Sequence, residues 1–171
     1  MSEIRNDVLK LISLCNFDKI PKKFWKDKEI VLASVKKEGW ALEYADEIFK
    51  KDKQIVLVAV KSNNGNPHNS GALKYAHESL RRDKDVVLEA VKYSEYALEY
   101  AHESLRKDKD VVLEAVKSFG WALRYVDPKL KKDSDVIQAT KKIRVFYELG
   151  GSIKSEEPLD IEELINYNPY T

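Results

Sequence analysis

Residues 75–92 read YAHESLRRDKDVVLEAVK, and residues 100–117 read YAHESLRKDKDVVLEAVK. The two stretches differ at one position, where Lys107 replaces Arg82. Further copies extend in both directions, and the aligned units begin at Asp27, Asp52, Asp83 and Asp108, with an incomplete fifth unit at Asp133. Self-similarity at a period of about 25 residues predicts a solenoid, in which no unit buries its apolar face alone.

Each unit is predicted to contain two helices. The opening aspartate is a favoured N-cap, because its carboxylate accepts a free backbone N–H of the first turn. In the third unit, the apolar residues of the first helix are Val86, Val87, Leu88, Ala90 and Val91. They cover most of the helix surface, so this helix is expected to lie between neighbours. The second helix carries Ala97, Leu98, Ala101 and Leu105 at helical spacing.

The unit resembles the repeats of the family called domain of unknown function 4116. The matching signature is Asp-Lys-x-Val-Val-Leu-x-Ala-Val-Lys, followed by Ala-Leu-x-Tyr-Ala and a basic end before the next aspartate. The resemblance covers about residues 27–140, and an insertion in the second unit departs from the family pattern. The family is found as tandem helical units with no general activity attached, so the resemblance implies a fold and adds little about function.

We therefore predict one all-α domain, a right-handed α-α superhelix of helix-turn-helix units. Residues 1–26 are expected to form an N-terminal cap and residues 27–132 four repeats. A partial repeat is expected at residues 133–151 and an acidic C-terminal tail or cap at residues 152–171.

The composition points to an ordinary globular protein. Hydrophobic residues make up 43% of the chain and charged residues 35%, which argues against disorder. The formal net charge of +1 gives no overall indication of nucleic-acid or membrane binding. The single cysteine, Cys15, excludes an internal disulfide framework and fits a reducing compartment. We expect a cytoplasmic monomer without membrane association, because no apolar stretch approaches the length of a membrane span.

The second unit carries an insertion of about six residues between Ser62 and Gly71. Its asparagine, glycine and proline residues are typical of loops. Long insertions cost little, because the entropy of loop closure grows only logarithmically with length. The segment is therefore either a tolerated surface insertion or a recognition loop on a rigid scaffold.

Aromatic residues recur at two repeat positions. One position holds Trp40, Tyr96 and Trp121, and the other, four residues later, holds Tyr44, Tyr75, Tyr100 and Tyr125. These side chains either pack the repeats together or form a partly exposed ladder that binds a peptide. The insertion removes the first aromatic from the second unit, which predicts a notch. The predicted partner-binding residues are Trp40, Tyr75, Tyr96, Asn64, Asn66, His68 and Asn69.

Histidines share a third repeat position, where His77 and His102 stand in line with Asp46 and Asp127. Equivalent positions on adjacent helices should be about 8–10 Å apart, which is wide for shared metal coordination. We therefore expect solvent-facing histidines and no metal site.

Basic pairs end each second helix, and lysines follow most of the capping aspartates. The pairs are Lys50-Lys51, Arg81-Arg82, Arg106-Lys107 and Lys131-Lys132. Together these residues predict a basic ridge along one edge, offset by the aspartates. The ridge is either solvated charge, a site for an acidic protein or a site for a nucleic-acid backbone.

Catalytic signatures are not found in the sequence. It contains no glycine-rich phosphate loop, nucleophile elbow or zinc-binding helix signature. We therefore expect no catalytic residues and no cofactor. The predicted function is a non-enzymatic protein- or peptide-binding helical-repeat module, and the alternative is nucleic-acid backbone binding through the basic ridge at the repeat junctions.

Overall fold

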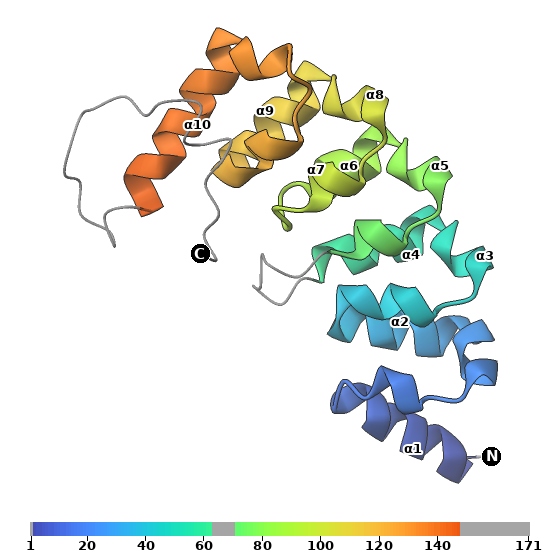
Figure 1. The fold of residues 1–171 in the computed structure, drawn as a ribbon. Coiled ribbons are helices and arrows are strands. Elements are labelled where there is room, and N and C mark those ends of the chain that lie inside the picture. The colour runs from blue at the N-terminus through green and yellow to red at the C-terminus, as the bar shows by residue number, and fades with distance from the viewer. Residues whose placement is uncertain (1, 63–70, 148–171) are drawn as a thin grey trace.

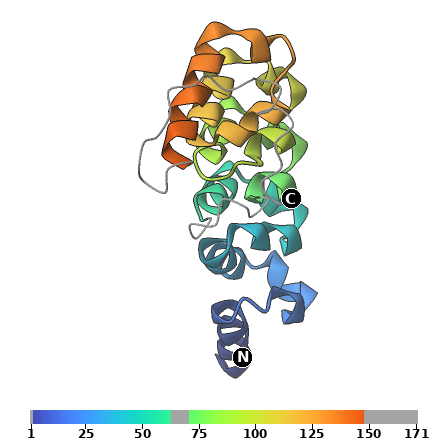
Figure 2. The ribbon, with the colours of Figure 1, turned by 60° about the vertical axis from the view of Figure 1, so that its left-hand side comes forward.

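The computed structural model describes residues 2–62 and 71–147, with side chains described between residues 4 and 140. Within these ranges the chain is helical and contains no strand. The repeats stack in chain order into a curved array, with α1 (Ser2–Ser13) at one end and α10 (Ser134–Tyr147) at the other (Figure 1, Figure 2). The predicted helical-repeat architecture is therefore confirmed. None of the described helices has the length and apolar character needed to cross a membrane.

The first helix of each repeat begins directly after a capping aspartate. These helices are α2 (Lys28–Lys37), α4 (Lys53–Lys61), α6 (Lys84–Ala90) and α9 (Lys109–Ser118). Each aspartate accepts hydrogen bonds from two backbone N–H groups of the first turn, as the sequence predicted. The helix α10 begins a fifth repeat after Asp133 and packs on α9.

The second helix of the repeat is broken in two, and the prediction of a continuous helix is wrong. The first parts are η3 (Gly39–Tyr44), η4 (Ala72–Tyr75), α7 (Ala97–Tyr100) and η5 (Gly120–Tyr125). The second parts are α3 (Glu47–Lys50), α5 (Glu78–Arg81), α8 (Glu103–Arg106) and η6 (Leu130–Lys132). In Figure 1, α3, α5 and α8 lie along the outer edge of the arc.

A hydrogen bond between neighbouring repeats accounts for the break. Ala101 is extended, with φ −66° and ψ 147°, and turns the next backbone N–H out of the helix. That N–H, on His102, donates to the carbonyl of Arg81 at 2.9 Å and so satisfies the end of the preceding repeat's short helix. The equivalent bonds run from Asp46 to Trp25, from His77 to Lys50 and from Asp127 to Arg106.

The N-terminal segment, predicted as a cap over residues 1–26, repeats this order in degenerate form. After α1 come η1 (Phe17–Lys19) and η2 (Lys22–Lys26). The helix α1 ends at Ser13, two residues before Cys15, so Cys15 does not continue the helix. Cys15 instead has φ 56° and lies in a Schellman motif, in which the N–H of Asn16 donates to the carbonyl of Leu11 at 2.9 Å.

The core follows the predicted pattern with one difference in α6. Val86, Val87 and Val91 are buried, but Leu88 is half-buried at the edge of the core. The most enclosed leucine of the third repeat is Leu98 of α7, which is 0% exposed. The leucine at the start of the broken second helix is therefore buried more completely than the leucine at the edge of the first helix.

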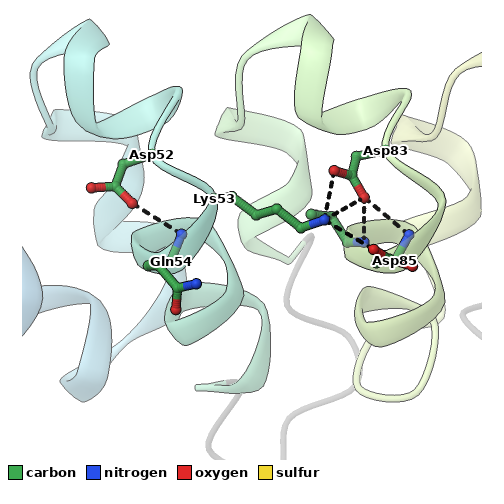
Figure 3. Close-up of polar contacts among 6 residues, drawn as sticks. Asp52, Lys53, Gln54, Asp83 and Asp85 are labelled. Atoms are coloured by element: carbon green, nitrogen blue, oxygen red, sulfur yellow. Dashed lines mark hydrogen bonds and ion pairs between the residues drawn. The ribbon is translucent and has the colours of Figure 1, made fainter.

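Lysines after the capping aspartates join each repeat to the next. The Nζ of Lys53 lies 2.8 Å from Asp83 Oδ2 and 3.0 Å from Asp85 Oδ2 (Figure 3). The equivalent contacts are those of Lys28 with Asp52, Lys84 with Asp108 and Asp110, and Lys109 with Asp133 and Asp135. This lysine relay stops at the fifth repeat, where Ser134 takes the place of the lysine. The relay pairs the four lysines of the predicted basic ridge with aspartates, and it leaves out the basic pairs.

Replacing Leu98 should cost more stability than replacing Leu88. We expect Leu98→Ala to lower the free energy of unfolding by about 2–5 kcal/mol, because the missing methyl groups leave a cavity in a packed core. Leu88→Ala should lower it by roughly half as much or less, because water already reaches part of that side chain. Urea denaturation measures both losses, and equal losses would contradict the assigned burial.

Replacing Asp108 separates its two roles. Asn is as good an N-cap as Asp but carries no charge, so Asp108→Asn loses only the ion pair with Lys84. Asp108→Ala loses the cap as well and should be about 1 kcal/mol less stable than Asp108→Asn. The difference is read from urea denaturation at neutral pH.

Asp108→Asn and wild type should also differ in how their free energy of unfolding changes at acid pH. Burial alone would raise the pKa of Asp108, but hydrogen bonds from Lys84 and from the backbone N–H groups of Val111 and Asp110 lower it below its ordinary value. The carboxylate therefore adds stability above its unfolded pKa of about 3.9, and this stability is lost as the pH falls through the folded pKa. Asp108→Asn should lose less stability than wild type across that pH range, and an unchanged loss would show that Asp108 does not contribute.

Candidate functional site

An aromatic cluster joins the N-terminal segment to the first repeat and includes one predicted partner-binding residue. Phe17 is fully buried at its centre, and its ring centroid lies 5.0 Å from that of Trp40 in an edge-to-face arrangement. Trp25 stacks on Tyr44 with ring centroids 5.3 Å apart. Trp40 is half-buried, so a large part of its surface contributes to packing between the N-terminal segment and the first repeat.

The tyrosines of the second aromatic position form a column of half-buried side chains. Tyr75 and Tyr100 are neighbours, because the Nζ of Lys74 lies 5.4 Å from one ring centroid and 6.0 Å from the other. Further along, burial and a hydrogen bond with Glu99 raise the pKa of Tyr125 to about 12. The column therefore packs against the core and also presents part of each ring to solvent.

The three aromatic residues of the predicted notch lie on successive elements. Trp40 is in η3, Tyr75 in η4 and Tyr96 directly before α7. The element η4 contacts both η3 and α7, and all three side chains are half-buried. The other predicted residues, Asn64, Asn66, His68 and Asn69, lie outside the described residues.

The paired histidines are helix caps and do not simply face solvent as expected. Nδ1 of His77 accepts a hydrogen bond from the Ser79 backbone N–H at 3.2 Å and so caps α5. His102 caps α8 through the N–H of Ser104 at 3.3 Å. The aspartates at this position in the flanking repeats do the same, a preference that the alignment of His with Asp could have indicated. In the described part of the chain, no group of three or more potential ligands could hold a metal ion.

A cleft of about 380 Å³ opens between the third and fourth repeats. It is bounded by α8 on one side and by η5 and the segment leading into η6 on the other. Its lining residues are Glu103, Arg106, Lys107, Arg124, Tyr125, Val126, Asp127, Pro128 and Lys131. Four of these side chains are basic and two are acidic, so the cleft is electropositive. We refer to this site as the basic cleft.

Most charged groups of the basic cleft have partners within the protein. Lys107 forms an ion pair with Glu103 one turn earlier in α8. The Nζ of Lys131 donates to the carbonyl of Arg124 at 3.0 Å, and burial lowers the pKa of this lysine. Asp127 accepts the backbone N–H of Lys129 at 3.0 Å. These contacts leave Arg106 as the residue whose charge is least satisfied.

Two arginines at one repeat position each have a buried side-chain nitrogen without a hydrogen-bond partner among the described residues. The Nε–H groups of Arg81 and Arg106 are both buried and donate to no acceptor there. The neighbouring member of each basic pair is exposed and bonded instead, as Arg82 is to Glu78 at 2.6 Å. The sequence identified the basic pairs but did not distinguish the half-buried residue from the exposed one.

The comparison with known proteins agrees with the repeat structure. The family described as Domain of unknown function (DUF4116) matches the chain five times, over residues 5–50, 27–81, 64–106, 83–131 and 108–143. The match to residues 83–131 spans two of the repeat units, and the first match begins within the segment predicted as an N-terminal cap. No curated protein and no solved structure matches the chain. Because the matches together run from residue 5 to residue 143, the chain belongs to the DUF4116 family and carries its domain in tandem.

Proposed function

We propose that the chain is a non-enzymatic module that binds a protein or peptide along its repeat junctions. The observation that carries this proposal is the pair of equivalent arginines, Arg81 and Arg106, with buried and unpartnered Nε atoms. A buried donor without an acceptor costs roughly 1–3 kcal/mol. A partner with acceptors for the terminal nitrogens of both guanidinium groups would offset part of that cost, and it would contact the chain at two positions one repeat apart.

The neighbouring tyrosines supply apolar contact area beside these charges. Tyr125 lines the basic cleft together with Arg106, and the repeat places Tyr100 in the corresponding relation to Arg81. Tyrosine and arginine are among the residues that contribute most to protein interfaces. Half-buried tyrosines also bind with little loss of conformational entropy, because packing already restrains them. An extended polypeptide is the partner that suits a row of such sites.

We also propose that the predicted notch extends this binding surface toward the N-terminus. Tyr75 continues the tyrosine column toward Trp40, and Tyr96 lies on the next element. The insertion residues Asn64, Asn66, His68 and Asn69 are proposed to contribute the polar contacts there. The proposal includes a right-handed superhelix, a cytoplasmic location and a monomeric state.

The alternative of nucleic-acid binding receives less support from the side-chain contacts. Lys53, Lys84 and Lys109 each pair with two carboxylates of the next repeat. A phosphate backbone would have to compete with these aspartates for each lysine. The basic cleft is confined to one repeat junction. It therefore does not join the lysines of the relay into a continuous positively charged surface.

Capture on immobilised protein tests the proposal. We expect wild type to retain a defined set of proteins in a way that nuclease treatment does not change. Arg81→Gln/Arg106→Gln should lose those proteins, because it removes both unpartnered guanidinium groups. Arg82→Gln/Lys92→Gln is the charge-matched control, since both residues are exposed, are already paired with glutamates and lie outside the lining of the basic cleft. Retention of nucleic acid alone, or equal capture by both double variants, would overturn the proposal.

A further inference from the structure

The basic cleft differs in charge from the repeat junction that precedes it. We propose that it binds an oxyanion, a phosphate monoester or a carboxylate, presented by an acidic side chain of a bound polypeptide. This inference rests on the proposed function and names the chemistry that one of its sites recognises. The charge of the cleft, the position of Arg106 and the difference from the preceding junction support this assignment.

The charge balance of the cleft favours an anion. Its two carboxylates already have partners, because Glu103 is bound to Lys107 and Asp127 accepts the backbone N–H of Lys129. Arg106 and Lys131 form no ion pair within the described residues. Glu103 interacts with the charge of Arg106 without forming an ion pair with it, so an oxyanion between Arg106 and Lys131 would be the first direct counter-ion of both.

The backbone around Arg106 is fixed before any ligand arrives. Its carbonyl accepts the N–H of Asp127 at 3.2 Å, so the end of α8 is held against the fourth repeat. Its Nε is buried at this junction, which restricts the guanidinium to the cleft. A planar guanidinium offers a fork of donors that matches two oxygens of a phosphate or carboxylate. Little ordering entropy remains to be lost on binding.

Lys131 provides a second cation on the opposite wall. Its Nζ is held by the carbonyl of Arg124 at 3.0 Å, which uses one of its three donors. Burial lowers the pKa of this lysine because its ammonium group has lost water without gaining a counter-ion. An oxyanion between Arg106 and Lys131 would supply that counter-ion.

The junction between the second and third repeats lacks the same charge. Arg81 corresponds to Arg106 and is equally without a partner among the described residues, but Glu99 occupies the position that Arg124 has in the cleft. Glu99 also forms a hydrogen bond with Tyr125 of the basic cleft, so the two junctions differ chiefly in the guanidinium group that Arg124 adds at the later one. The chain thus provides its own comparison, because Arg106 shares its cleft with a second arginine and Arg81 has no arginine at the equivalent position.

Phosphate alone serves as the first probe, in a titration of the full chain at low ionic strength followed by NMR. We expect saturable shifts at the cleft for wild type and for Arg81→Gln. Affinity should fall about tenfold or more in Arg106→Gln and in Lys131→Met, because each loses a charge-assisted contact. Two separate variants guard against misfolding of one, and circular dichroism checks both. Equal affinity in all four proteins, or no saturable binding, would overturn the inference.

Peptides then distinguish the sources of the oxyanion. Three peptides with phosphoserine, aspartate or serine at one position are compared by fluorescence anisotropy. Tighter binding of the phosphoserine peptide assigns the site to phosphate, equal binding of the phosphoserine and aspartate peptides assigns it to any oxyanion, and equal binding of all three contradicts it. Phosphate binding without protein capture would contradict the proposed function alone, and capture without phosphate binding would contradict this site alone.

Discussion

The stack depends on one carboxylate that serves two repeats. Asp83 accepts the backbone N–H groups of Asp85 and Val86 and so begins α6, and it also binds Lys53 of the preceding repeat. Helices of seven to ten residues are marginal alone. Because the same carboxylate both begins a helix and attaches it to its neighbour, helix formation and stacking are coupled. Stability then accumulates through contacts between adjacent repeats.

The parts of the fold that depend on local pattern could be predicted from the sequence. The period, the capping aspartates and the first helices follow from residue spacing and from N-cap preference. The broken second helix could not be predicted from hydrophobic spacing, because Leu98, Ala101 and Leu105 fit a continuous helix equally well. The break depends on a bond from His102 to Arg81 of another repeat, and such a bond leaves no periodic signal.

The candidate site shows a similar division. The sequence revealed the basic pairs at the repeat ends but treated both members alike. Spacing within the short helices could have distinguished the two members of a basic pair. Glu78 lies four residues before Arg82, and an ion pair at i, i+4 is favoured. That reading would have left Arg81 without a local partner. The cleft itself depends on how Arg124 meets α8 across a junction, which only the stacked structure reveals.

The serine that ends the lysine relay has a consequence for assembly between molecules. An open-ended stack with a lysine on its last turn would offer an ammonium group to the first aspartate of another copy. Such a head-to-tail contact does not close on itself and leads to filaments. Ser134 has no charge to offer, and the adjacent Asp133 and Asp135 are already bound to Lys109. The lysine–aspartate contact that joins the repeats within the chain therefore has no counterpart at the start of α10, and this contact cannot attach a second copy there.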